Sequence, residues 1–162
     1  MDYLWTPWRY QYVVATAQTP ECVFCEAART GNDKDALIVH RAAHNFIILN
    51  RFPYTSGHVM VVPYAHVSTL DALDEDAAME IMRLTRDCER HLRTLYKTEG
   101  LNIGMNIGKA AGAGVASHLH QHVLPRWSGD VNFMTTIAET RILPEPLDIT
   151  WDRLSQAFSA SE

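Results

Sequence analysis

The sequence lacks several features that would define its class at once. No apolar run approaches the roughly 20 residues that a membrane-spanning helix needs, and residues 1–20 lack the charged-then-apolar plan of a secretory signal peptide. The three cysteines, Cys22, Cys25 and Cys88, are too few for a disulfide framework. We therefore expect a cytoplasmic protein that does not bind membranes.

Positive charge is not in excess either. Lysine and arginine total 14, aspartate and glutamate total 19, and the formal net charge is −5. Nucleic-acid binding depends on neutralising phosphates, so we expect no nucleic-acid partner. One local pocket can still bind a small phosphorylated ligand. The 162 residues contain no internal repeat or low-complexity tract, and this length is typical of a single domain.

The hydrophobic patterning predicts an α+β fold. Short apolar segments bounded by turn residues are typical of β-strands, and the connections between the first three are too short for parallel crossovers. The predicted strands are residues 36–40, 45–49, 58–62, 101–107 and 118–124. With one long helix and short flanking helices, including one over residues 148–158, they predict a mostly antiparallel five-stranded sheet.

The long helix is predicted over residues 74–97. Asp74 is a candidate N-cap, and Gly100 follows the helix end. Apolar residues recur at intervals of three and four and form one face, Ile81, Leu84, Cys88, Leu92 and Leu95. The opposite face carries Arg83, Arg86, Arg90, Arg93 and Lys97. Acidic residues interleave with this basic face, so we interpret it as solvated and assign it no function.

Three histidines at alternate positions are the strongest functional signal. His118, His120 and His122 fall in the last predicted strand, where alternating side chains place them on one face about 6.6 Å apart. One such histidine is often a structural residue, but three buried imidazoles each need partners for two nitrogens. The pattern therefore predicts metal ligation, nucleophilic catalysis or phosphate recognition.

A glycine-rich segment leads directly into the histidines. Residues 108–114 read GKAAGAG, and such small residues allow backbone N–H groups to approach an anion closely. The segment is not a P-loop, because Ala110 stands where a serine or threonine would hold magnesium. Alone it would more often be a hairpin connection, but its position before the histidines points to phosphate.

The histidine segment resembles the signature of the histidine triad (HIT) family, in which each of three histidines is followed by an apolar residue. It reads HLHQHVL over residues 118–124 and continues into Pro125-Arg126. Gln121 is the departure from the pattern, and we expect it to alter packing on the other side of the sheet. The resemblance covers roughly residues 22–126, inside a single HIT domain over residues 1–162.

Other segments resemble the same family. Residues 49–51 (LNR), 57–59 (GHV) and 62–63 (VP) are similar to its nucleoside-binding strand pair, and residues 106–108 (NIG) and 111–112 (AG) to its phosphate loop. Residues 4–9 (LWTPWR) and 127–133 (WSGDVNF) resemble bacterial diadenosine tetraphosphate phosphorylases and Fhit-like hydrolases. This branch implies dinucleoside polyphosphates or related nucleotides as substrates, and a homodimer. Trp5 and Trp8 either cover a core edge or subunit contact or lie near the nucleotide.

The resemblance implies a two-step transfer in which His118, His120 and His122 are the catalytic residues. His120 would attack the α-phosphorus and form a nucleotidyl-histidine, which water or phosphate then resolves. His122 would hydrogen-bond phosphate oxygens as charge develops. His58 either orients the triad or is ordinary core packing. The implied nucleotide-binding residues, besides His122, are Asn50, Asn106, Gly112, Gly114, Val115 and Ser117.

The Cys-x-x-Cys pair predicts a separate site. Two thiolates at this spacing can bind one tetrahedral ion, and a redox pair is the alternative. The family resemblance implies that Cys22, Cys25, His66 and His118 hold a structural zinc. Four protein ligands fill the coordination sphere, so such an ion would brace the fold rather than activate water. We expect Cys88 to lie in the core.

Three other functions are open at this stage. Another HIT branch hydrolyses nucleoside phosphoramidates, although the tryptophan motifs argue against that branch. The three histidines could instead hold a catalytic metal jointly, which would make the protein a metallohydrolase. A nucleotide-binding regulatory module without turnover has no support in a triad this complete.

Overall fold

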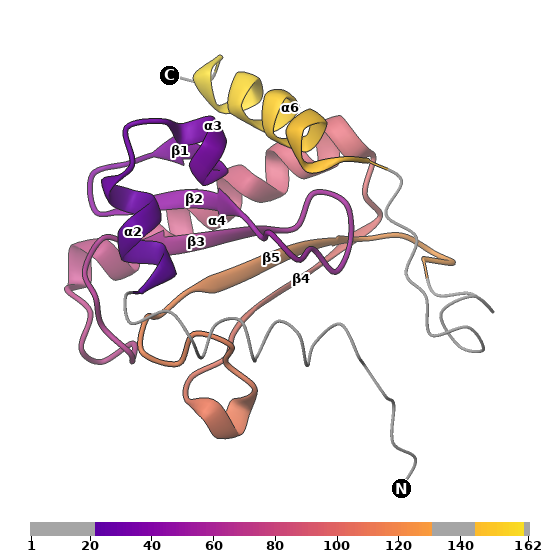
Figure 1. Ribbon diagram of the computed structural model, residues 1–162. Coiled ribbons are helices and arrows are strands. Elements are labelled where there is room, and N and C mark those ends of the chain that lie inside the picture. The colour runs from indigo at the N-terminus through magenta and orange to yellow at the C-terminus, as the bar shows by residue number, and fades with distance from the viewer. Residues whose placement is uncertain (1–21, 131–144, 161–162) are drawn as a thin grey trace, which may run out of the picture.

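One antiparallel sheet organises the protein. This computed structural model describes residues 22–130 and 145–160. The elements are α2 (Val23–Arg29), α3 (Asp33–Ala36), β1 (Ile38–Arg41), β2 (Asn45–Leu49), β3 (Val59–Pro63), α4 (Glu75–Tyr96), β4 (Gly100–Met105), η1 (Lys109–Ala111), β5 (Gln121–Arg126) and α6 (Leu147–Ser159). The sheet order is β1-β2-β3-β5-β4, and every pair is antiparallel, which confirms the predicted fold (Figure 1). No helix within the described ranges is long and apolar enough to cross a membrane.

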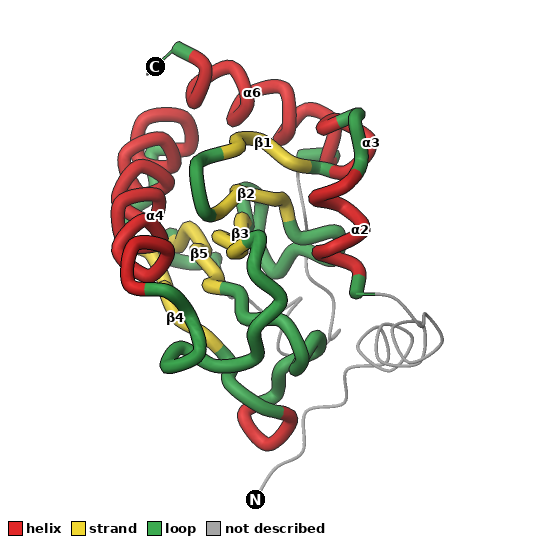
Figure 2. The backbone as a smooth tube through the Cα atoms, turned by 90° about the vertical axis from the view of Figure 1, so that its left-hand side faces the viewer, coloured by secondary structure: helices red, strands yellow, loops and turns green. Residues whose placement is uncertain are grey.

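Different helices cover the two faces of the sheet. Figure 2 shows α4 on one side of the strands and α2 on the other, with α6 beside β1. Ile47 and Val61 enter the larger core against α4, whereas Ile48 and Met60 pack with Phe24 of α2 in a smaller core. Strands β2 and β3 are therefore buried on both faces. Such strands read as continuous apolar runs, which explains why the sequence predicts them well.

Helix α4 agrees with its prediction at the start and differs at the end. Asp74 Oδ1 accepts a hydrogen bond from the Asp76 N–H at 3.0 Å, and the predicted apolar face is buried against the sheet. The basic face is exposed. The expectation that Gly100 follows the helix as its end signal is wrong, because Lys97 takes the left-handed conformation at φ 51°. Gly100 already pairs with Arg126 as the first residue of β4.

Several predicted strand boundaries are wrong. β1 begins at Ile38, because residues 33–36 form the short helix α3. β3 is displaced by one residue, and β4 ends at Met105 rather than at residue 107. β5 begins at Gln121, because the Leu119 N–H donates to Val67 O at 2.7 Å instead of to a neighbouring strand. His118 and His120 therefore precede the strand that was expected to carry the whole triad.

Helix α6 protects the β1 edge of the sheet. The predicted helix over residues 148–158 is present as Leu147–Ser159. Its Trp151 Nε1–H donates to the carbonyl of Ile38 at 2.7 Å, and Leu154 and Phe158 enter the larger core. A covered edge carbonyl is not open to pairing with another chain.

Candidate active site

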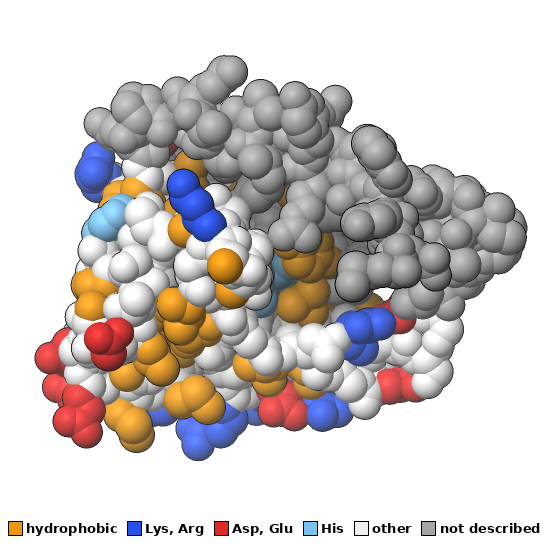
Figure 3. Space-filling view, turned by 90° about the horizontal axis from the view of Figure 1, so that it is seen from below, with side chains coloured by type: hydrophobic (Ala, Val, Ile, Leu, Met, Phe, Trp, Pro, Cys, Tyr) orange, Lys and Arg blue, Asp and Glu red, His pale blue; other side chains and the backbone are white. Residues whose placement is uncertain are grey.

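A cavity of about 990 Å³ opens on the face of the sheet that α2 covers. Ile48 and Met60 of the central strands line it, together with Phe24 of α2, His120 and His122. Figure 3, which views the molecule from below, shows histidine atoms recessed between hydrophobic side chains. The cavity thus combines an apolar wall with a few polar groups, as small-molecule sites generally do.

Most of the predicted nucleotide-binding residues meet in this cavity. Those that line it are Asn50, Asn106, Gly112, Gly114, Val115 and His122, and His120, the predicted nucleophile, lines it as well. Ser117 and His118 belong to the described part of the chain but are not among the lining residues. The tryptophan motif at residues 4–9 and residues 131–133 lie outside the described residues.

A chain of hydrogen bonds determines which nitrogens of His58 and His122 carry protons. The Tyr54 backbone N–H donates to His58 Nδ1 at 3.2 Å, so neutral His58 carries its proton on Nε2. His58 Nε2 lies 2.9 Å from His122 Nδ1 and donates to it. Neutral His122 therefore carries its proton on Nε2, and this N–H is the group that His122 can offer to a ligand.

The opposite arrangement holds for His120. Its Nδ1 lies 2.8 Å from the backbone oxygen of His118, and a carbonyl can only accept, so Nδ1 carries the proton. Nε2 of neutral His120 consequently has a free lone pair. The ring packs against Phe24 and His122, each with a centroid distance of 5.0 Å. The cavity therefore presents a nucleophilic nitrogen beside a hydrogen-bond donor.

Burial keeps these histidines uncharged at neutral pH. It lowers the pKa of His58 to about 3, with a further contribution from the nearby His122 and His120. Burial beside His120 lowers the pKa of His122 to about 4. Burial also lowers the pKa of His120, partly offset by its hydrogen bond to the His118 carbonyl. The lone pair on His120 is thus available without prior deprotonation.

His118 faces a second site. Its Nε2–H donates to Pro63 O at 2.9 Å, which leaves the Nδ1 lone pair 3.2 Å from Cys22 Sγ and 3.6 Å from Cys25 Sγ. His66 Nδ1 lies 3.2 Å from Cys25 Sγ. One ligand atom from each of these four residues lies within 4.8 Å of the other three. The structure thus brings together the four residues of the predicted metal site.

This donor set fits zinc. Tetrahedral bonds of about 2.0–2.3 Å place neighbouring ligand atoms roughly 3.3–3.8 Å apart, close to the separations just given. The bond from His118 to the Pro63 carbonyl directs the His118 lone pair toward the cysteines, as outer hydrogen bonds do for metal-binding histidines. When bound, zinc would link α2 to the segment before β5. With four protein ligands it would have no open position for water.

Gln121 and Cys88 lie on the far side of the sheet from the cavity. Gln121 Nε2 donates to Thr85 Oγ1 of α4, and Thr85 Oγ1 donates to Ile81 O at 2.7 Å. Cys88 of α4 is buried in the larger core, as predicted. The polar residue in the triad segment therefore binds the long helix and does not enter the cavity.

Sequence reasoning missed several residues of the cavity. Phe24 and Tyr54 contact the histidine rings, and Arg51 and Lys109 add positive charge. Phe24 lies between Cys22 and Cys25. Arg51 lies in the motif at residues 49–51 and Lys109 in the glycine-rich segment at residues 108–114, but only other residues of these segments were named as candidates. Position within a recognised motif was thus the signal that could have found Phe24, Arg51 and Lys109, whereas Tyr54 lies between two motifs and had no such signal.

Comparison with known proteins decides the family. The HIT domain model matches residues 32–129. This chain belongs to the HIT family. The HIT protein is 37% identical over 152 residues to AP-4-A phosphorylase of Mycobacterium tuberculosis, a match that covers 89% of this chain and 77% of the relative. It is also 34% identical over 113 residues to an uncharacterized HIT-like protein of Saccharolobus solfataricus, covering 70% of this chain and 79% of that one.

Solved structures share the HIT fold. A Zn-bound histidine triad family protein from Mycobacterium smegmatis has a TM-score of 0.68 and 25% identity, covering 88% of this chain and 98% of that protein. Diadenosine triphosphate hydrolase of Plasmodium falciparum has a TM-score of 0.62 and covers 80% of this chain and 77% of its own, but at 17% identity it supports the fold alone.

Proposed function

We propose that this protein cleaves dinucleoside polyphosphates by transferring a nucleotidyl group to His120 and then to phosphate or water. The chain is a HIT-family enzyme of the nucleotide phosphorylase and hydrolase type. The likeness to a mycobacterial phosphorylase supports the choice of substrate. The observation that carries the chemistry is the free lone pair on His120 Nε2 beside the Nε2–H of His122.

The proposed first step forms a bond between His120 Nε2 and the α-phosphorus. The bond from that phosphorus to the bridging oxygen breaks, and its electron pair leaves on the departing nucleotide. His120 becomes positively charged, and its Nδ1–H stays bonded to the His118 carbonyl, which stabilises that charge. His122 Nε2–H donates to an oxygen on which negative charge develops. In the second step phosphate or water attacks the same phosphorus and releases His120.

The metallohydrolase alternative has little support in the geometry. Three histidines that hold one metal must point lone pairs at a common position. Here His118 directs its lone pair toward the cysteines, and His122 Nδ1 receives the proton of His58. Hydrolysis of nucleoside phosphoramidates uses the same His120 chemistry, so substrate tests must separate it from our proposal.

We further propose that Cys22, Cys25, His66 and His118 hold a structural zinc. The separations of the ligand atoms and the orientation of His118 support this assignment. The ion would brace the segment that carries His120 and would take no part in bond making.

The decisive experiment is turnover of diadenosine tetraphosphate with and without inorganic phosphate. ADP plus ATP formed only with phosphate would indicate a phosphorylase, and AMP plus ATP in plain buffer would indicate a hydrolase. Protein quenched at alkaline pH during turnover should carry one acid-labile adenylyl group. His120→Asn should abolish turnover and adenylylation while nucleotide affinity stays within roughly threefold, because the ring supplies the nucleophile. Near-normal turnover by His120→Asn would refute the covalent mechanism.

A further inference from the structure

Two of the three cysteines are accessible, and together they form a pair. Cys22 and Cys25 are half-buried, whereas Cys88 is 1% exposed and lies in the larger core. Cys22 is the N-cap of α2, and Cys25 lies in the first turn of that helix. Their sulfur atoms lie within 4.8 Å of each other. The spacing that suits a metal site is therefore also that of two thiols which one oxidation can join.

Formation of a disulfide between these two cysteines requires only a local change. A disulfide joins sulfur atoms about 2.0 Å apart on residues whose Cα atoms are about 4.4–6.8 Å apart. Residues separated by one helical turn have Cα atoms about 5 Å apart, which falls inside that range. Rotation of the two side chains can therefore bring the sulfur atoms together, and the sheet does not have to move.

The chemical form of cysteine that binds zinc is also the form that reacts with peroxides. A thiol bound to zinc is a thiolate, and exposed thiolates beside a second cysteine are typical of redox-sensitive sites. One thiolate attacks an oxygen of hydrogen peroxide, the O–O bond breaks, and a sulfenic acid and hydroxide form. The second thiolate displaces hydroxide from that sulfur and completes the disulfide. The sulfurs lose two electrons to the peroxide, and two solvent protons convert the two hydroxides to water.

Oxidation would remove two of the four ligands of the proposed zinc site. The sulfurs of a disulfide carry no thiolate charge, so only His66 and His118 would be left to hold the ion. His118 connects this loss to the nucleophile. Its Nδ1 lies 3.2 Å from Cys22 Sγ, and its backbone oxygen accepts the Nδ1–H of His120 at 2.8 Å. The residue that fixes the proton on His120 is therefore itself part of the cysteine cluster.

Phe24 provides a second connection, because it lies in the sequence between the two cysteines. Phe24 is 5% exposed, and its ring packs at centroid distances of 5.4 Å from His118 and 5.0 Å from His120. It also lines the active-site cavity. Drawing Cys22 and Cys25 together changes the turn that carries Phe24, so the change reaches both the cavity wall and the ring of His120.

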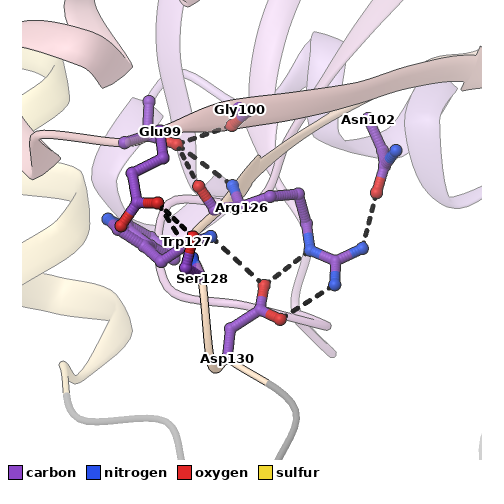
Figure 4. Close-up of polar contacts among 8 residues, drawn as sticks. Glu99, Gly100, Asn102, Arg126, Trp127, Ser128 and Asp130 are labelled. Atoms are coloured by element: carbon purple, nitrogen blue, oxygen red, sulfur yellow. Dashed lines mark hydrogen bonds and ion pairs between the residues drawn. The ribbon is translucent and has the colours of Figure 1, made fainter.

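The other end of the histidine segment is held by contacts that do not involve the cysteines. The Arg126 guanidinium donates to both carboxylate oxygens of Asp130, at 2.6 and 2.9 Å, and to Asn102 Oδ1 at 2.7 Å (Figure 4). The Arg126 backbone N–H donates to Thr98 Oγ1 at 3.0 Å, and β5 pairs with both β3 and β4. Oxidation should therefore alter the region around the cysteine cluster while the sheet stays folded.

We propose that Cys22 and Cys25 form a reversible thiol switch, in which oxidation to a disulfide by a hydroperoxide releases the zinc ion and slows nucleotidyl transfer at His120. The inference rests on the proposed zinc site and the proposed function, and it adds a means by which the activity responds to oxidants. Neither cysteine is among the residues that line the cavity. Both are positioning residues, because they act on His120 through His118 and Phe24.

Zinc-loaded wild-type protein treated with hydrogen peroxide provides the first test. Peptide mapping should find a disulfide between Cys22 and Cys25. Thiol titration should show the loss of about two thiols per chain, and a chelating dye should detect the release of about one zinc ion. Dithiothreitol followed by zinc should reverse all three changes. Cys88 should stay reduced, because it is buried in the core.

Two functional measurements on the same samples test the effect on the cavity. Oxidation should lower kcat for diadenosine tetraphosphate about tenfold or more, because His120 loses indirect support. The affinity for AMP, which needs no turnover, should fall about threefold or more, because the wall formed by Phe24 changes. Dithiothreitol with zinc should restore both values. The far-UV circular dichroism of the oxidised protein should stay close to that of the reduced protein.

Two variants and one chemical distinction serve as controls. Cys22→Ser combined with Cys25→Ser should show no loss of turnover that dithiothreitol reverses, whereas Cys88→Ala should respond to peroxide as the wild type does. Met60 also lines the cavity and can be oxidised, but methionine sulfoxide is reduced by dedicated reductases. Recovery with dithiothreitol therefore assigns the effect to the thiols.

The outcomes separate this inference from the two proposals on which it rests. Zinc and thiols that both survive peroxide, or full turnover by the protein that carries the disulfide, would overturn the switch. Wild-type protein purified without stoichiometric zinc would refute the zinc assignment, and a reduced enzyme that forms no adenylyl-histidine would refute the proposed function. In either case an AMP affinity unchanged by formation of the disulfide would overturn the switch, and a reversible loss of affinity would support it.

Discussion

His58 Nε2 lies 2.9 Å from His122 Nδ1, and this contact determines which nitrogen of His122 is left for the substrate. The other nitrogen of His58 accepts the Tyr54 backbone N–H at 3.2 Å, so His58 can only donate toward His122. The Tyr54 ring also packs against His58 with a centroid distance of 4.8 Å. The Tyr54 backbone N–H therefore determines which nitrogen of His122 carries the proton, although it donates to His58 and not to His122.

His58→Ala should lower kcat for diadenosine tetraphosphate about 10- to 100-fold, because His122 would lose the partner that fixes its tautomer. KM should change little, since His58 lies behind His122 and is 1% exposed. His58→Gln should recover part of the loss, because an amide N–H can replace the donor. Steady-state kinetics test this, and a KM effect with unchanged kcat would show that His58 has no orienting role.

Replacing Cys22 and Cys25 together by serine should remove about one bound zinc per chain and lower the melting temperature by several degrees, because structural zinc contributes directly to folding. Metal analysis and thermal unfolding measure the two effects. Cys88→Ala is the matched control: its thiol is buried in the core far from the cluster, so the metal content should not change. Stoichiometric metal in the Cys22/Cys25 variant would disprove the ligand assignment.

Gly57→Ala should reduce the free energy of unfolding by about 1–3 kcal/mol. Gly57 has φ +80°, and an added Cβ would lie 3.0 Å from Leu92 Cδ2 and 3.3 Å from Pro125 Cγ. Gly31→Ala is the matched control, because a Cβ there meets nothing within 4 Å and its φ lies outside the left-handed region. Urea denaturation should show the loss at position 57 only. Similar values for both variants would contradict the packing argument.

Stability should fall as the pH drops below about 6.5. The folded-state pKa of His58 is lowered to about 3, so between these values the unfolded chain binds the proton and the fold does not. Between pH 7 and pH 5 the protonation of His58 in the unfolded chain should lower the free energy of unfolding by about 2 kcal/mol. This loss is absent above the pKa of histidine in the unfolded chain. When both proteins are denatured at several pH values, the free energy of unfolding should depend less steeply on pH for His58→Gln than for the wild type. An unchanged slope would contradict the prediction.

Much of the fold and part of the site could be predicted from the sequence. The β2 run at residues 45–49, the apolar face of α4 and the N-cap Asp74 follow from local periodicity and capping, which involve neighbouring residues only. The HIT family follows from the triad segment and its flanking motifs. The four residues of the metal cluster could be named for the same reason, as could seven of the residues that line the cavity: Asn50, Asn106, Gly112, Gly114, Val115, His120 and His122.

Tertiary structure alone decided how the three histidines divide their roles. Strand alternation predicted one common face, but a hydrogen bond from Leu119 to Val67 delays the start of β5, and His118 turns toward Cys22. The proton positions on His120 and His122 depend on acceptors and donors supplied by the His118 carbonyl and by His58. Some of these contacts join groups that are distant in the sequence, and the others depend on the direction in which a backbone carbonyl points. Neither the residue type nor the spacing of residues in the sequence specifies such contacts. The sequence determined which residues could do the chemistry, and folding determined which nitrogen of each faces the cavity.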